Sequence, residues 1–245
     1  LPMMNISGLC RWDLCHLLAE AMDSLRRENP GYFPVKPRKR FLKINKLRYR
    51  LLPYLYSTAY ETHYKGLPMM RAMVLEFQED RNVRNLSRQY MLGESLLVAP
   101  VFDQEIVKVY LPKGSWIDFN TGERLEGGKW ITAEKRLDQI PLYLRENHMI
   151  PMLQEAPMHI ENRNFEKLVV ILNLQGELEA HYYDDGICGK LFAKLVNENT
   201  HNRKVKEMKI ELFEVYSEKE ICNCVVNKNA WKLKKTEHGF IATRG

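Results

Sequence analysis

The segment Leu47–Val101 constrains the fold of this chain more than any other, because a helical pattern changes there into a strand pattern. Apolar and aromatic side chains recur every three or four positions between Lys39 and Lys65, which predicts an amphipathic helix with a kink at Pro53. Gly66 and Pro68 end this helix, since glycine suits the position after a helix and proline cannot continue it. The sequence therefore predicts one long, kinked helix that leads into β structure.

Short apolar strands separated by turn residues occupy most of the chain after this helix. We expect them at 70–77, 95–102, 105–111, 115–119, 129–132 and 140–144, and again at 167–174, 178–183, 190–196, 207–216, 220–226, 231–233 and 239–243. Many short strands at roughly ten-residue spacing are typical of antiparallel β-sandwiches. The polar segment 153–164, which contains Pro157, indicates a boundary between two such domains.

Three motifs occur here in the order found in family 31 glycoside hydrolases, the α-glucosidases and α-xylosidases. They are LLPYLY at 51–56, GLPMMRAMVLEF at 66–77 and RQYMLGESLLVAPV at 88–101. The chain resembles the junction between the catalytic barrel and the C-terminal sandwiches of that family. The segment 140–151 and the Asp-Asp-Gly turn at 184–186 resemble further family elements.

The resemblance implies a mainly β fold, with antiparallel sandwich domains preceded by a helix from the end of a (β/α)8 barrel. Residues 1–38 match nothing in the family, and 39–66 correspond to the last barrel helix. Residues 67–153 then form a proximal C-terminal β-sandwich and 165–245 a distal one.

The same resemblance limits the chemistry that we expect from this chain. Retaining glycosidases need a nucleophile and an acid/base carboxyl about 5–5.5 Å apart, and a (β/α)8 barrel takes about 250 residues. Only 46 residues precede Leu47, and the catalytic aspartates of the family have no matching position. The histidine of a sugar-binding His-Gly pair is also missing, because His16 is followed by Leu17.

We therefore expect no catalytic, substrate-binding, cofactor-binding or metal-binding residue and no cofactor. The chain is expected to be the C-terminal region of a retaining α-glucosidase or α-xylosidase, to support the barrel as its partner, and to be inactive alone. The alternative is a free-standing accessory or carbohydrate-binding β-sandwich module. What lies upstream of such a region distinguishes the two interpretations.

Two acidic pairs invite an acid/base interpretation. Glu79-Asp80 and Asp184-Asp185 are neighbours in sequence, however, which does not place them across a pocket. Aspartate in an Asp-Gly turn is first a turn former. Arg71 and Glu76, together with Arg88, fit a buried ion-pair set between sandwich and barrel.

Three aromatic residues offer a possible carbohydrate contact. Trp116, Phe119 and Trp130 would form a sugar-stacking platform if their flat faces were exposed. Aromatic residues of a small sandwich more often belong to its core, which is the interpretation that we favour.

Charge and cysteine content exclude several other classes of function. The net charge of +6 is dispersed, and its densest run, 36–40, lies beside two prolines, so we expect no nucleic-acid partner. The five cysteines are irregularly spaced, so we expect no disulfide framework. We expect no zinc site either, because neither candidate group has a second ligand pair at zinc-site spacing; the groups are Cys10, Cys15 and His16, and Cys222 and Cys224. No apolar run approaches the length of about 20 residues that a membrane helix needs. We expect a cytoplasmic protein without a membrane partner.

Self-association is the remaining partner expectation. The helix face that carries Tyr49, Tyr54, Leu55 and Tyr56 would be partly uncovered without a barrel against it. An exposed apolar patch of this kind favours association or aggregation.

Overall fold

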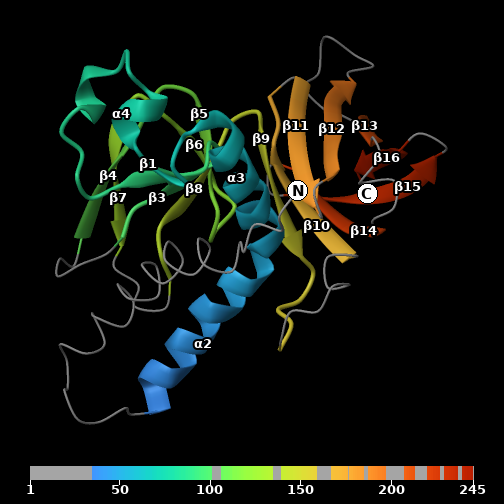
Figure 1. Cartoon of the computed structure of the whole chain (residues 1–245), viewed down its shortest axis with the longest axis horizontal. Coiled ribbons are helices and arrows are strands. Elements are labelled where there is room, and N and C mark those ends of the chain that lie inside the picture. Colours follow the sequence, from blue (N-terminus) through green and yellow to red (C-terminus); the bar gives the residue numbers. More distant parts are fainter. Residues whose placement is uncertain are drawn as a thin grey trace.

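The computed structural model describes residues 35–100, 106–134, 139–158, 167–175, 177–184, 187–196, 207–212, 220–226, 229–236 and 239–244. These residues form two helices followed mainly by antiparallel strands (Figure 1). The expected mainly β fold is thereby confirmed. The predictions for Cys10, Cys15, His16 and Asp185 lie outside the described residues.

The long helix is divided in two, as Pro53 predicts. Helix α2 (Val35–Arg50) and helix α3 (Leu52–Lys65) meet at Leu51. Pro53 lies in the first turn of α3, where its missing N–H costs nothing because no intrahelical acceptor is available there. Gly66 ends α3 in the left-handed conformation, with φ of 69°, and its N–H donates to the carbonyl of Thr62 at 3.0 Å.

The proximal part is built on an antiparallel six-stranded sheet, which the hairpin of two further strands covers. The order in the sheet is β1 (Met70–Ala72), β2 (Tyr90–Leu92), β3 (Leu96–Val98), β8 (Leu142–Arg145), β5 (Ser115–Asp118) and β6 (Arg124–Glu126). The hairpin pairs β4 (Ile106–Leu111) with β7 (Lys129–Glu134). A turn after Asp118 joins β5 to β6, and the two strands pair as an antiparallel hairpin.

Both faces of the six-stranded sheet are buried. Leu97, Trp116 and Tyr143 point to one face, where they pack with Val109 of the β4–β7 hairpin. The alternate residues, such as Leu96, point to the other face and pack on α3 and on strand β9 (His148–Leu153). Burial on both faces explains why β3 reads as a continuous apolar run rather than as an alternating one.

The predicted strand at 70–77 is wrong in its second half. Strand β1 ends at Ala72, and Met73–Glu76 form the single-turn helix α4. Residues five apart in a strand point to opposite faces, so a strand would hold Arg71 and Glu76 apart. The helical turn instead brings the Glu76 carboxylate to 2.6 Å from the buried Arg71 guanidinium.

A second sheet contains the C-terminal strands. Its order is β11 (Glu177–Asp184), β12 (Ile187–Val196), β13 (Glu207–Leu212), β16 (Gly239–Arg244), β15 (Asn229–Thr236), β14 (Glu220–Val226), β10 (Lys167–Asn173) and β9. All the strands expected after residue 165 are present among these. The two end strands, β11 and β9, contact one another, so the sheet curls back on itself. Only the β10–β14 pair is parallel within this sheet.

Strand β9 links the two parts of the protein. It belongs to the segment that we predicted as the proximal domain, yet it pairs along its whole length with β10. Asn173 at the end of β10 is fully buried and donates to the carbonyls of Ser115 and Leu144, on β5 and β8. The division into domains at 153–165 therefore stays a prediction, since hydrogen bonds join the strands across it.

Helix α3 lies between the two groups of strands (Figure 1) and contacts both β9 and β11. The expectation of an uncovered tyrosine face is therefore wrong for Tyr54 and Leu55, which are 5% and 1% exposed. Tyr49 and Tyr56 are half-buried. Residues of the six-stranded sheet and of β9 cover Tyr54 and Leu55. Self-association stays a prediction. No helix in the described part is long and apolar enough to cross a membrane.

One close approach fixes α3 on the six-stranded sheet. The Tyr54 hydroxyl donates to the Leu92 carbonyl at 2.5 Å and accepts from the Ser95 N–H at 3.3 Å. Gly93 lies between these two, in the left-handed conformation with φ of 62°. A Cβ atom at Gly93 would lie 2.5 Å from the Tyr54 hydroxyl oxygen. Only glycine fits there.

We predict that Gly93→Ala lowers the free energy of unfolding by about 2–5 kcal/mol. The left-handed conformation costs a non-glycine residue about 1–2 kcal/mol, and displacing Tyr54 adds lost or unsatisfied hydrogen bonds of about 1–3 kcal/mol. Urea denaturation measures the change. Gly66→Ala is the matched control, because Gly66 has φ of 69° but nothing within 4 Å of the new Cβ. Equal losses for the two variants would show that the contact with Tyr54 is unimportant.

Candidate functional site

Alternating charges join four elements at the end of α3. Glu76 of α4 accepts from Arg71 of β1 at 2.6 Å and lies 3.4 Å from Arg145 of β8. Arg71 also lies 3.7 Å from Glu61 of α3. Arg71 is only 2% exposed, and a buried charge of this kind needs partners of opposite sign. The predicted Arg71–Glu76 ion pair is thereby confirmed.

Arg88 takes no part in this series, contrary to our expectation. It is exposed at the surface before β2, where water solvates its charge. Its place beside Glu76 is taken by Arg145, whose guanidinium also lies 4.6 Å above the Phe77 ring. Sequence spacing did not indicate this pairing, because Arg145 lies 69 residues from Glu76.

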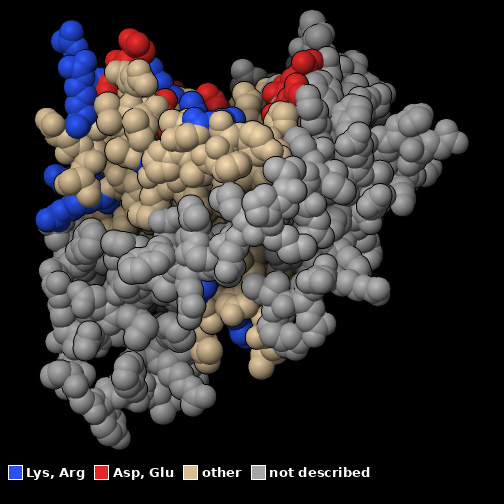
Figure 2. All heavy atoms as spheres, in the orientation of Figure 1, with Lys and Arg blue, Asp and Glu red and all other residues tan. Residues whose placement is uncertain are grey.

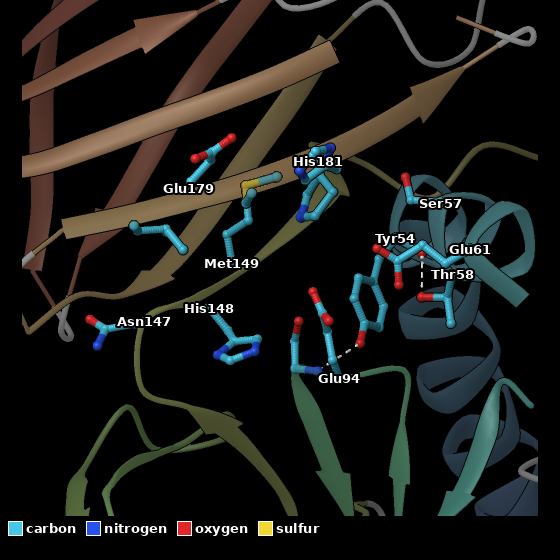
Figure 3. A pocket seen from close by; sticks show the side chains of 14 residues that line it. Tyr54, Ser57, Thr58, Glu61, Glu94, Asn147, His148, Met149, Glu179 and His181 are labelled. Atoms are coloured by element: carbon cyan, nitrogen blue, oxygen red, sulfur yellow. Dashed lines mark hydrogen bonds between the residues drawn. The ribbon is translucent and has the colours of Figure 1, made fainter. Parts of the chain in front are cut away.

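A small polar cavity adjoins the ion pairs, between α3, the β2–β3 turn, β9 and β11 (Figure 3). Helix α3 contributes Tyr54 and Glu61 to its wall, and the β2–β3 turn contributes Glu94. Strands β9 and β11 contribute His148 and His181. Figure 3 shows these side chains converging from opposite sides. The cavity has a volume of about 60 Å³.

The two carboxylates at this cavity, those of Glu61 and Glu94, share one neighbouring cation. Lys65 lies 3.4 Å from Glu61 and 3.9 Å from Glu94. Burial raises the pKa of Glu61, the nearby Glu94 charge raises it further, and Lys65 and Arg71 oppose the change. Glu61 therefore binds a proton more readily than an exposed glutamate does.

Burial has the opposite effect on the pKa of His148, which it lowers. Its Nδ1 lies 2.7 Å from the carbonyl of Glu146. Burial lowers the pKa of His148 and the Arg145 charge lowers it further, whereas the Glu146 carbonyl, Glu94 and Glu76 act to raise it. The neutral imidazole is therefore favoured at neutral pH.

This cavity is too small for glycoside chemistry. Ligand pockets typically measure about 300–1,000 Å³, and a glycosidase must also hold a sugar between two carboxyl groups. A volume of about 60 Å³ holds a few water molecules at most. Within the described part of the chain, no group of histidine, cysteine, aspartate and glutamate side chains is arranged to hold a metal ion.

The acidic pairs from the sequence do not meet in a pocket. Glu79 is exposed, whereas Asp80 accepts from the Asn82 N–H at 3.0 Å and so caps the 3-10 helix η1 (Arg81–Val83). Asp184 ends β11; its side chain and Asp185 lie outside what the structure describes. Asp80 has the local structural role that turn chemistry predicts.

The three aromatic residues of the proposed platform are separated. Trp116 is fully buried and its Nε1–H donates to the Pro112 carbonyl at 2.8 Å. Phe119 is half-buried against the core cluster beside α3. Trp130, in contrast, is 53% exposed on β7. The core interpretation is right for Trp116, and no common platform forms.

Sequence reasoning missed the residues that do converge at the cavity. Glu61, Glu94 and His148 come from a helix, a turn and a strand far apart in the chain. Only Glu61 carried a local signal, since it lies four residues before Lys65 on one helix face. The tertiary arrangement alone brings the other two to it.

We predict that His148 makes the chain less stable as the pH falls from about 7 to 5. The unfolded chain takes up the proton at the usual histidine pKa of about 6.5, whereas the folded chain resists protonation because its His148 pKa is lowered. The contribution is therefore fully present above pH 6.5 and is lost as the pH falls towards the folded-state pKa.

Urea denaturation at several pH values measures this loss. His148→Gln, which cannot titrate, should have a flatter pH profile in this window than the original chain. His181→Gln is the matched control, because it removes an exposed histidine from the same cavity. Identical slopes for His148→Gln and the original chain would contradict the assignment.

Comparisons with known proteins identify the family to which the central part of the chain is similar. Residues 66–150 match the glycosyl hydrolase family 31 C-terminal domain. The α-xylosidase of Saccharolobus solfataricus is 40% identical over 164 residues, which cover 65% of this chain and 22% of the relative. The isomaltosyltransferase of Sporosarcina globispora is 40% identical over 55% of this chain and 12% of its own length.

The similarity extends to a solved structure of the family. A family 31 dextranase from Flavobacterium johnsoniae, complexed with glucose, superposes with a TM-score of 0.67 and 32% identity. The match covers 81% of this chain and 26% of the dextranase chain. This chain thus spans about a quarter or less of the length of these relatives. Residues 66–150 are a glycoside hydrolase family 31 C-terminal domain, and the chain is similar to a family 31 enzyme over part of that enzyme's length.

Proposed function

We propose that this chain is the C-terminal region of a retaining α-glycosidase of the α-glucosidase or α-xylosidase type, and that it supports the catalytic barrel without hydrolysing glycosides itself. The observation that carries the proposal is the match of residues 66–150 to the C-terminal domain alone. Two relatives that match about two thirds of this chain are glycosidases. This chain corresponds to only about a fifth of the length of each.

Helices α2 and α3 are the proposed contact with the barrel. The α2 helix projects beyond the strands (Figure 1) and contacts α3 and β9. Leu42 on α2 is 44% exposed. Arg50 at the end of α2 donates to the Leu153 carbonyl of β9 at 3.1 Å, so it orients the helix on the sandwich. A helix that is fixed at one end and projects beyond the strands leaves surface, including Leu42, available to a packing partner.

The described residues also favour a supporting role over catalysis. Transition-state stabilisation of glycoside hydrolysis needs positioned carboxyl groups on both sides of a sugar. The carboxylates that converge here, Glu61 and Glu94, face a cavity of about 60 Å³ and share Lys65. They hold elements of the fold together by charge, and leave no room for a substrate.

We predict that the purified chain does not release product from aryl α-glucosides or α-xylosides. Rate enhancements of enzymes need about 8–23 kcal/mol of transition-state stabilisation, which carboxylates at a surface turn do not supply. A barrel-containing relative is the positive control. Turnover that persists through repurification and disappears on changing Asp184 or Asp185 to Asn would show that the active site lies in this chain.

A chimaera tests the supporting role directly. In the Saccharolobus solfataricus α-xylosidase, the 164-residue matched region would be exchanged for that of this chain. We expect the chimaera to fold and to keep α-xylosidase activity, because the exchanged region supplies packing rather than reacting groups.

Two variants of that chimaera test whether the buried ion pairs of this chain are needed for the activity of the barrel at higher temperature. Arg71→Met leaves the Glu76 and Glu61 carboxylates without their buried partner, which costs about 3–5 kcal/mol, so activity should be lost at a lower temperature. Lys113→Met is the control, since Lys113 is exposed. A well-folded but inactive chimaera would contradict the proposed function.

A further inference from the structure

Trp130 is held in a position that core packing does not explain. It lies on β7 directly opposite Tyr110 of β4, on the face of the hairpin that points away from the six-stranded sheet. Its side chain is 53% exposed, whereas Trp116 is fully buried. Large aromatic side chains gain most of their stabilisation from burial, so an indole that is half in water requires another reason.

The residue beneath this indole is unusually well fixed. The Gln89 side chain donates to the Tyr110 carbonyl at 2.7 Å and accepts from the Tyr110 N–H at 2.9 Å. The Tyr110 hydroxyl donates to Asp80 at 2.7 Å and accepts from Asn82 at 3.0 Å. Backbone and hydroxyl are thus both clamped, and Tyr110 is only 3% exposed.

Trp130 rests on this fixed ring. The two ring centroids lie 5.3 Å apart with an interplanar angle of 55°, a geometry that favours aromatic contact. One part of the indole covers Tyr110 while the rest faces solvent. The side chain is therefore preorganised, because its strand and its supporting ring are both rigid, and a ligand that stacks on it pays little ordering entropy.

Polar side chains lie on the same side of the hairpin as the indole. Asn82 and Lys108 are exposed on this side of the hairpin. Thr132 is exposed as well, and it lies on the same face as Trp130 because the two are two residues apart along β7. Asp80 supplies a carboxylate: although burial acts to raise its pKa, the hydrogen bonds from Tyr110 and Asn82 lower it. The surface thus offers a flat apolar face with donors and acceptors at its edge.

Figure 2 shows lysine and arginine side chains at separate places on the visible face rather than in one patch. A neutral ligand with an apolar face and a polar rim matches the Trp130 surface better than an anion does. The pyranose ring of a sugar has this chemistry, since its C–H groups form a flat face and its hydroxyls form the rim.

We propose that Trp130 is the stacking residue of a surface subsite for neutral oligosaccharides, with Asp80, Asn82, Lys108 and Thr132 as its hydrogen-bonding rim. The subsite lies on the hairpin β4–β7, and a substrate chain would be held there outside any catalytic pocket. The choice of α-linked glucose and xylose oligosaccharides as probes rests on the proposed function; the stacking surface itself does not.

The test is a titration of the whole 245-residue chain labelled with 5-fluorotryptophan. Isomaltotriose, maltotriose and an α-xylosylated oligosaccharide are added in turn, and fluorine NMR follows each tryptophan. We expect a saturable shift of the Trp130 resonance with at least one sugar and no shift of Trp116. Trp130→Phe assigns the resonance.

Affinity measurements on variants complete the test. Trp130→Ala should weaken binding at least about tenfold, the loss expected for a central aromatic contact, and Trp130→Phe should retain part of it. Tyr64→Ala is the matched control, because Tyr64 is an exposed aromatic residue, 68% exposed, on α3. An unchanged Trp116 resonance verifies that each variant is folded.

Two results would overturn the subsite. One is the absence of a saturable Trp130 shift with all three sugars, and the other is equal sugar affinity in Trp130→Ala and the original chain. Either result leaves the chimaera experiment untouched, so failure of the subsite is distinct from failure of the supporting role. The second result, if it is accompanied by loss of binding in Tyr64→Ala, would place a sugar site on α3 instead.

Discussion

The contact between Tyr54 and the turn at Gly93 is the constraint on which the rest of the structure depends. The Tyr54 hydroxyl bonds to the backbone on both sides of Gly93, which fixes the first turn of α3 on the turn between strands β2 and β3. Burial raises the pKa of this hydroxyl to about 12, so it remains a neutral donor. With α3 fixed, one side of the helix meets the six-stranded sheet and the other meets β9 and β11. The two groups of strands are arranged around a single helix.

The ion pairs at the end of α3 complete this arrangement. Arg71 reaches Glu76 in α4 and Glu61 in α3, while its Nε–H donates to the Pro68 carbonyl at 3.0 Å. The need to place a carboxylate against a buried guanidinium explains why the chain leaves the strand conformation after Ala72. The polar cavity beside these pairs is then a consequence of charged side chains meeting at a junction, where close apolar packing is not attainable. Its size agrees with a structural rather than a catalytic origin.

The residues that carry the family motifs and the residues of the proposed sugar subsite lie in different parts of this protein. The motifs that identify family 31 lie on α3, β1, β2 and β3, which surround the junction and are mostly buried. Trp130 lies on the outer hairpin, away from these motifs in sequence. Its exposure and its clamped support are properties of the tertiary structure, as the hydrogen bonds of Gln89 and Asn82 to Tyr110 show. A supporting domain can thus carry a binding surface of its own without any part in catalysis.

The sequence by itself determined the resemblance to family 31, the helix that Pro53 divides and Gly66 ends, and most of the strands, because these depend on local periodicity and turn chemistry. It also identified the Arg71–Glu76 pair, whose members lie close in the chain. It did not predict strands β2, β6 and β9. Only the tertiary structure decided that Arg145 rather than Arg88 completes this pair, that Tyr54 is covered, and that Trp116 and Trp130 differ in exposure. These depend on which segments meet in space: Arg145 lies 69 residues from Glu76, and Tyr54 lies 38 from Leu92. Burial and charge pairing over such separations follow from the packing of whole layers, and no local pattern of residues records them.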